Sequence, residues 1–170
     1  MYEKFTKCPW KRIIKTEYDS YDLSPVIEKQ LSGKGPFMLL IEGEAMSNSC
    51  VLGVFCAHTF PKLTGAIGTN NVTINNSDNH FMFYYERSGE EVTCHYRTKV
   101  SDDFEKFMTY SDIAESDKGL QVFHDDQEKV FLSFVHGQAT HVDLYPMKCL
   151  DTDPKQHFEF PYDFHCRGIE

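Results

Sequence analysis

Cysteine and histidine are the residues of this sequence with the widest chemical range, and six Cys and eight His occur among its 170 residues. Cys56 and His58 are two positions apart, so on a β-strand they would share one face. With a third ligand such as His141 they could form a zinc site, and a thiolate beside an imidazole could act as a nucleophile. The alternative is that Cys56 packs inward as a small apolar residue while His58 lies at a strand end.

Other sequence patterns that announce chemistry are absent. The chain contains no C-x-x-C, G-x-G-x-x-G, G-x-x-x-x-G-K-[ST], G-x-S-x-G or H-E-x-x-H, the motifs typical of thiol and zinc sites, nucleotide loops, hydrolases and zinc proteases. Acidic clusters near residues 102–105 and 125–128 lack calcium-loop spacing and are typical of solvated faces. We therefore expect no enzyme, no cofactor and no resident metal.

The composition indicates an acidic globular chain. Lys and Arg number 17 and Asp and Glu 26, which gives a net charge of −9, and 41% of the residues are hydrophobic. An acidic chain repels phosphate backbones, so nucleic acid is not an expected partner. No apolar run approaches the ~20 residues of a membrane helix, and the N-terminus has no signal-peptide core. These observations predict a single cytoplasmic domain over 1–170 with reduced thiols, without membrane insertion and monomeric in isolation.

The first part of the chain predicts a helix followed by a hairpin. Ser24 suits a helix N-cap and Pro25 the first helical position, after which Val26, Ile27 and Leu31 form one apolar side. The run 37–42 predicts a central strand that is apolar on both faces, with 50–60 as its hairpin partner. Because Phe37, Leu39 and Ile41 alternate along it, they should share one face.

Further strands follow at regular spacing. Residues 80–86 and 91–97 predict a second hairpin around a Gly-containing turn, in which Phe81, Phe83 and Tyr85 should pack into the core. Runs at 119–125 and 129–137 predict a third, and 139–145 and 164–170 further strands. The stretch 101–116 is compatible with a capped helix beginning near Asp102 or with a loop. The pattern indicates an α+β fold, a β-sandwich of two antiparallel sheets with a few flanking helices.

The segment from Pro61 to Asn79 predicts a long loop, and loops of this length are typically functional or mobile. We interpret it as the place where the domain contacts another protein. Leu63 and Ile67 would serve as exposed apolar anchors among polar residues. The expected contact residues are Leu63, Gly65, Ile67, Gly68, Asn70 and Asn71.

The order of these elements resembles the TLDc domain of the oxidation-resistance proteins. The resemblance rests on a single Trp, a capped helix, a Gly-Pro leading into an apolar strand, a hairpin with G-x-F, and a closing strand whose last residues match the start of the family's ending. The positions that carry it are Trp10, Gly53, Phe55, Cys149, Gly168 and Glu170. His58 stands where the family has an acidic residue, and the family's glycine run before the second late strand is missing, which marks a divergent member.

The resemblance implies a non-catalytic interaction or regulatory domain in a larger cytosolic protein. Oxidative-stress protection and regulation of the vacuolar proton pump, the V-ATPase, are the roles it implies, with V-ATPase subunits as partners. The strand-like end at Glu170 predicts that 1–170 is a fragment of a longer protein. Two other classes remain open from the residues themselves: a cysteine-based redox or metal-binding domain, and a β-sandwich that binds a small ligand.

Overall fold

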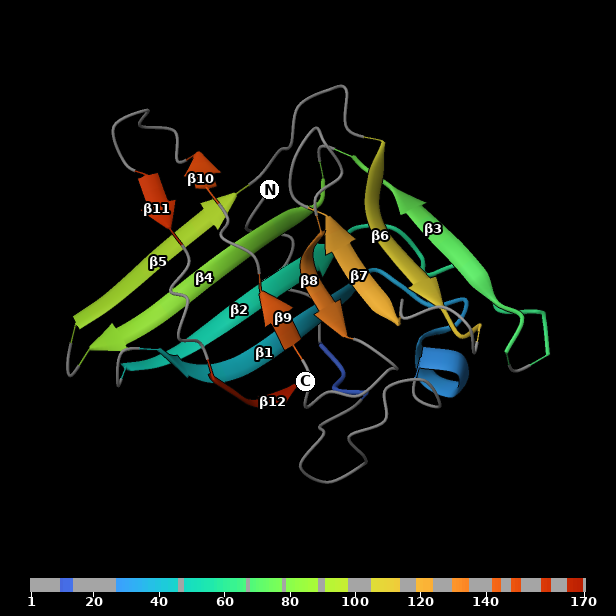
Figure 1. The fold of residues 1–170 in the computed structure, drawn as a ribbon, viewed down its shortest axis with the longest axis horizontal. Coiled ribbons are helices and arrows are strands. Elements are labelled where there is room, and N and C mark those ends of the chain that lie inside the picture. Colours follow the sequence, from blue (N-terminus) through green and yellow to red (C-terminus); the bar gives the residue numbers. More distant parts are fainter. Residues whose placement is uncertain are drawn as a thin grey trace.

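Two antiparallel sheets make up most of the fold in the structure, which is a computed structural model. It describes residues 10–13, 27–45, 48–66, 68–77, 79–88, 91–97, 105–113, 119–123, 130–134, 142–144, 148–150, 157–159 and 165–169. The first sheet has the order β12-β1-β2-β4-β5 (Figure 1). Its strands are β1 (Phe37–Ala45), β2 (Asn48–Cys56), β4 (Phe81–Ser88), β5 (Glu91–Arg97) and β12 (His165–Ile169).

The second sheet has the order β3-β6-β7-β8-β9, and a separate pair joins β10 to β11. The strands of the second sheet are β3 (Asn71–Asn75), β6 (Lys106–Ser111), β7 (Leu120–Phe123), β8 (Val130–Phe134) and β9 (Val142–Leu144). The pair consists of β10 (Lys148–Leu150) and β11 (His157–Glu159). Before the strands, a short π-helix, η1 (Ile27–Leu31), buries both of its terminal apolar residues.

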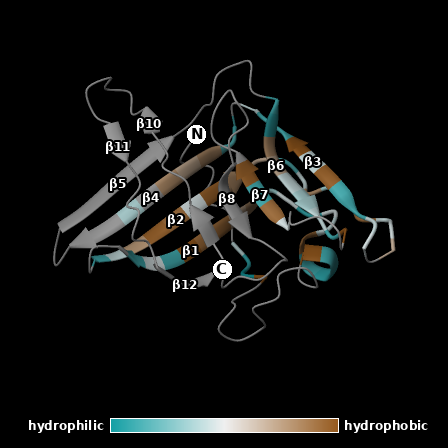
Figure 2. Ribbon diagram, viewed as in Figure 1, coloured by the Kyte–Doolittle hydropathy of each residue, from teal (hydrophilic) through white to brown (hydrophobic). Residues whose placement is uncertain are grey.

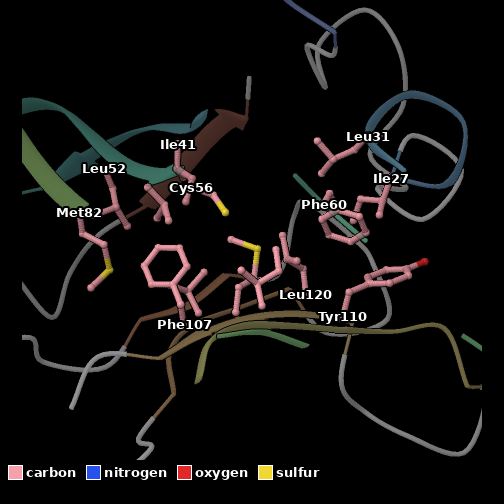
Figure 3. Close-up of a cluster of buried hydrophobic side chains, with 14 of the residues drawn as sticks. Ile27, Leu31, Ile41, Leu52, Cys56, Phe60, Met82, Phe107, Tyr110 and Leu120 are labelled. Carbon is pink, nitrogen blue, oxygen red and sulfur yellow. The ribbon is translucent and has the colours of Figure 1, made fainter. Parts of the chain in front are cut away.

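One apolar cluster joins the two sheets. In the first sheet Ile41 lies opposite Leu52, and Val54 lies opposite Met82, so these side chains share a face. The second sheet contributes Ile74, Met108, Tyr110, Leu120 and Val122, and η1 contributes Ile27 and Leu31. Figure 3 shows the labelled members of the cluster converging, with Leu52 and Met82 on one side and Tyr110 and Leu120 on the other. Full burial of each large apolar side chain stabilises the fold by roughly 1.5–3 kcal/mol.

A bulge in the second sheet adds an aromatic side chain to this cluster. The register between β3 and β6 shifts after Ile74, which lies opposite Met108, whereas Asn75 lies opposite Lys106. The extra residue is Phe107. A bulge breaks the strict alternation of a strand, so Phe107 and Met108 are both buried, at 2% and 0% exposure.

The faces of the two sheets that point away from the cluster differ in polarity. On the first sheet, Met38, Phe55 and Phe81 form one row in register, and Phe55 stacks on Phe81 with ring centroids 4.8 Å apart. Figure 2 shows the apolar colouring of β1 and β2. On the second sheet, the register aligns a polar row across β3, β6 and β7: Thr73, Thr109 and Gln121.

Several predictions from the sequence are confirmed. The chain is rich in strands arranged in antiparallel sheets, and the hairpins β1–β2, β4–β5 and β7–β8 lie where they were expected. β1 is an inner strand between β12 and β2. In the part of the chain that the structure describes, no helix is long and apolar enough to cross a membrane.

Other predictions are wrong. Residues 61–79 are not one loop, because β3 lies within them, and the helix considered for 101–116 is excluded by β6. The row Phe81, Phe83 and Tyr85 is half-buried on the face away from the cluster, while the intervening Met82 is buried in it. Ser24, Pro25, Val26 and Asp102 lie outside the described residues.

Candidate interaction site

Hydrogen bonds to the end of η1 hold the first residues of the loop between β2 and β3. Its first residues run beside the end of η1, where Gly33 N–H donates to Phe60 O at 3.0 Å and Phe60 N–H donates to Lys34 O at 2.8 Å. Leu63 N–H donates to the Ser32 hydroxyl at 2.8 Å. Leu63 itself is half-buried and packs against the apolar cluster. It is therefore part of the base of the loop and not the exposed anchor that the sequence suggested.

A buried amide and a distant carboxylate hold the other end of the loop. Asn70 is 6% exposed, and Asp112 follows β6, 42 positions further along the chain. The Asn70 N–H donates to Asp112 Oδ1 at 2.6 Å, and its side-chain Nδ2 donates to Oδ2 at 2.7 Å. Asp112 N–H returns a bond to Asn70 O at 3.1 Å. We call this set of bonds the Asn70–Asp112 brace.

The brace also shapes the loop inside it. Asn70 Oδ1 accepts from Gly65 N–H at 3.1 Å, and Asn70 Nδ2 donates to Ala66 O at 3.3 Å. Thr69 closes the same turn through its N–H and hydroxyl, which both donate to Ala66 O. Gly68 has a φ of +89°, a left-handed conformation that glycine adopts without the cost borne by other residues.

Charge reinforces the brace. Burial raises the pKa of Asp112, but hydrogen bonds from the Asn70 side chain and main chain, from Gly68 N–H and with the Glu28 side chain together lower it below its ordinary value. The carboxylate is therefore ionised at neutral pH. Hydrogen bonds to a charged acceptor are stronger than neutral ones, so the brace favours a single loop shape.

The described part of the loop tip is made of small exposed residues. Thr64, Gly65, Ala66, Thr69 and Asn71 are all exposed. Five of the six contact residues expected from the sequence therefore lie together at this loop, with Leu63 and Asn70 supporting it and Gly65, Gly68 and Asn71 nearer its surface. The sixth, Ile67, lies outside the described residues. The arrangement offers exposed backbone and hydroxyl groups in a fixed geometry.

A packed group of one Cys and two His, Cys56, His58 and His80, lies next to this loop. Cys56 is fully buried, and its thiol donates to His58 O at 3.6 Å. Burial raises the pKa of Cys56 to about 11, while the bond to His58 O opposes the rise. A nucleophilic or redox-active thiol needs a lowered pKa and access to solvent, so Cys56 has the features of a core residue. His58 is exposed just past the strand end.

His80 is the buried member of this group and is 3% exposed. Its Nδ1 accepts from Ala57 N–H at 3.0 Å, and its Nε2 lies 3.2 Å from Asn75 O. These partners fix a neutral ring with the proton on Nε2. The ring stacks on Phe107 at 4.2 Å and meets His58 edge-on at 4.6 Å.

Neither ring nitrogen of His80 is aimed at an open ligand position, because both face main-chain partners. Within the described ranges, no three His, Cys, Asp or Glu side chains are grouped in a way that could hold a metal ion. The third zinc ligand considered from the sequence, His141, lies outside those ranges.

The described residues that carry the family resemblance lie in or against two parts of the fold, the first sheet and the β10–β11 pair. Trp10 meets Phe55 edge-on at 6.3 Å on the apolar face of the first sheet. Gly53 lies under the Phe83 ring, where a Cβ would come within 2.0 Å of ring atoms. Gly168 of β12 pairs with Glu42. Cys149 pairs with Phe158 in the β10–β11 pair, and Glu170 lies outside the described residues.

Comparison with known proteins gives no relative: no family model, no curated protein and no solved structure matches the chain.

The residues missed by sequence reasoning are Asp112, Glu28 and His80. An Asp after a strand and a Glu on a short helix are common on any surface, so neither carries a signal of its own. Asn70 was among the expected contact residues, and Asn in a loop is typical of side-chain to main-chain bonding.

Proposed function

We propose that this chain is a non-catalytic protein-interaction domain that contacts its partner through the tip of the β2–β3 loop, residues 64–69. The observation that supports this proposal is the Asn70–Asp112 brace, in which a buried amide holds exposed residues in one shape. A loop ordered before binding loses less conformational entropy when it binds, and the smaller loss raises the affinity.

The finer description follows the family resemblance. The domain is a divergent TLDc-type α+β sandwich with flanking helices, part of a larger cytoplasmic protein that acts in oxidative-stress protection or V-ATPase regulation. V-ATPase subunits are accordingly the first partners to test. The antiparallel sheets and the braced loop are the structural features that support this description.

Binding of purified V-ATPase subunits to three forms of the chain tests the proposal. The loop form carries Thr64→Arg and Ala66→Arg, two exposed positions whose side chains take no part in the brace. The control carries Ser49→Arg, at an exposed position in β2. At about 3.3 Å per residue, Ser49 lies roughly 23 Å from the end of β2 that leads into the loop. Leu63 is unsuitable because it supports the core.

The expected result is that the loop form loses at least about tenfold in affinity, the size of a typical contact residue at about 1.4 kcal/mol. Its melting temperature should match that of the wild type, and the Ser49→Arg control should bind normally. Equal binding by all three forms would remove the loop from the interface. If no form binds a V-ATPase subunit, the family-based choice of partner is wrong.

A further inference from the structure

The β3 edge of the second sheet is a second surface of a different kind. β3 is the outermost strand of that sheet, and none of the described strands pairs with its far side. Figure 1 shows β3 at the border of the molecule. An edge strand presents main-chain donors and acceptors to any strand that approaches it.

The ladder to β6 shows which main-chain groups point outward. Asp112 N–H donates to Asn70 O, so position 70 faces β6, and in an antiparallel ladder positions 72 and 74 then do the same. Asn71 and Thr73 alternate with them and direct their N–H and C=O away from β6. At the far end of β3, Asn75 O already has the His80 ring beside it.

The sequence of β3 reads almost the same in both directions. It is Asn71-Val72-Thr73-Ile74-Asn75, with a β-branched residue on each side of a central Thr and an Asn at each end. A two-fold interface requires a surface that is complementary to itself. When such a strand pairs antiparallel with its own copy about the centre, Thr meets Thr, Val meets Ile, and Asn meets Asn.

We propose that two copies of this chain associate by antiparallel pairing of β3 with β3, on a two-fold axis beside Thr73. The two Thr73 residues exchange N–H to C=O bonds, and Asn71 of each copy lies opposite Asn75 of the other. Val72 and Ile74 line the core side of the joined strands. The two five-stranded sheets become one continuous sheet of ten strands.

Side-chain chemistry favours a second copy as the occupant. None of the five residues of β3 is charged, although the chain as a whole carries −9, so the copies meet where their mutual repulsion is small. Cross-strand Thr–Thr pairs and pairs of β-branched side chains are favourable contacts. One five-residue strand from each copy is short, and interfaces below about 1,200 Å² are weak and transient.

Engineered cysteines test both the pairing and its register. In the proposed pair the two Thr73 Cα atoms are about 5.5 Å apart, within the range that a disulfide spans. The two Asn71 Cα atoms are separated by at least about 13 Å along the strands, too far to bridge. With oxidised glutathione as the oxidant, Thr73→Cys should form a linked dimer at least about tenfold faster than Asn71→Cys.

A mixture of Asn71→Cys with Asn75→Cys should give the mixed dimer in preference to either symmetric one, with the linked peptides identified by mass spectrometry. Equal rates for Thr73→Cys and Asn71→Cys would show random collision and overturn the proposal. A mixed product that is no more abundant than the symmetric ones would overturn the register.

Sedimentation equilibrium at protein concentrations up to about 1 mM, a weak-binding range, gives an independent measurement. Thr73→Pro removes an outward N–H without removing a bond to β6, and it should weaken self-association at least tenfold, that is by about 1.4 kcal/mol. Thr73→Val, which keeps the main chain and the β-branched shape, should leave self-association unchanged. Thr73→Lys, a variant that adds charge without altering the main chain, should also dissociate the dimer, and more strongly at low salt.

A wild type that stays monomeric over the whole concentration range overturns the proposal, and so does an association that survives both Thr73→Pro and Thr73→Lys. The Thr64→Arg, Ala66→Arg form should still self-associate. Failure of β3 pairing therefore leaves the proposed loop interface untouched, and failure of the loop interface leaves β3 pairing untouched.

Discussion

Protonation of His80 should destabilise this fold as the pH falls from about 6.5 to about 4. The ring is 3% exposed and neutral, with main-chain partners at both nitrogens. Its pKa is lowered from an ordinary 6.5 to about 4 by burial first and by the neighbouring His58 second, while the bond to Asn75 O opposes the change. Between these values the unfolded chain binds a proton at this residue that the folded chain does not.

The sign and size of the effect follow from linkage. Because the unfolded state holds more protons below pH 6.5, the free energy of unfolding decreases as the pH falls, and the loss is complete below about pH 4. The full difference in pKa corresponds to about 3 kcal/mol. Solvent around the exposed His58 screens part of the repulsion, so we expect a loss of about 2 kcal/mol.

Urea unfolding of the wild type and of His80→Gln at pH 7.0 and near pH 4.5 isolates the contribution of this residue. Gln retains an acceptor and a donor but does not titrate, so its stability should depend less on pH by about 2 kcal/mol. His58→Gln removes only the neighbouring charge and should reduce the pH dependence by a smaller amount. If the wild type and His80→Gln lose the same stability, His80 is not the buried neutral group described above.

Three further predictions concern the core, the brace and the apolar face. Leu31→Ala should lower the free energy of unfolding by about 2–5 kcal/mol. The exposed neighbour offers a control, because Gln30→Ala should change that free energy by less than about 0.5 kcal/mol. Equal losses would place Leu31 at the surface. Asp112→Ala should lower the free energy of unfolding by about 3 kcal/mol, because it leaves two buried donors without an acceptor. Asp112→Asn keeps one acceptor and should lose about half of that. Urea unfolding at pH 7 compares the two variants, and an Asp112→Ala variant as stable as the wild type would contradict the brace. Gly53→Ala should lower the free energy of unfolding by about 1–3 kcal/mol, because the added methyl group forces the Phe83 ring off the sheet. A double-mutant cycle with Phe83→Ala should show that the two losses are not additive. Additive losses would mean that the two residues do not touch.

Periodicity and turn chemistry were sufficient to predict the hairpins. In β4–β5, for example, two runs rich in aromatic and β-branched residues flank a Gly-containing stretch of sequence, and such local information survives without a fold. The period of two along a strand shows that Phe81 and Phe83 share a face, but it cannot show which face meets the core. That choice depends on Met82 packing against Val54 from β2, a contact between distant parts of the chain.

The strands β3 and β6 were missed for a related reason. β3 is five residues long and is flanked by Gly, Asn and Ser, which are turn formers, so its two apolar residues give little signal. In β6 the bulge buries the adjacent residues Phe107 and Met108, and this removes the alternation by which a strand is recognised. The pairing between β3 and β6 determines where both strands lie, and it exists only in the folded chain.

The composition predicts where the candidate loop lies, but it does not predict which residues hold the loop in shape. Two glycines and several Asn indicated a turn-rich segment with adaptable hydrogen bonding. Asp112 and Glu28 lie far from it in sequence, and nothing local connects either of them to Asn70. Leu63 was assigned to the surface because apolar residues in loops are often anchors, whereas its contact with the core depends on the position of Ser32.

The bonds that shape the loop have a consequence for the order of folding. Leu63 is held by a residue 31 positions before it, and Asn70 by one 42 positions after it. Contacts of such sequence separation form only after the intervening chain has been closed into place, which makes them slow. The loop should therefore reach its final shape late, after Asp112 has left the ribosome, and a synthetic peptide of residues 61–71 alone should not adopt it.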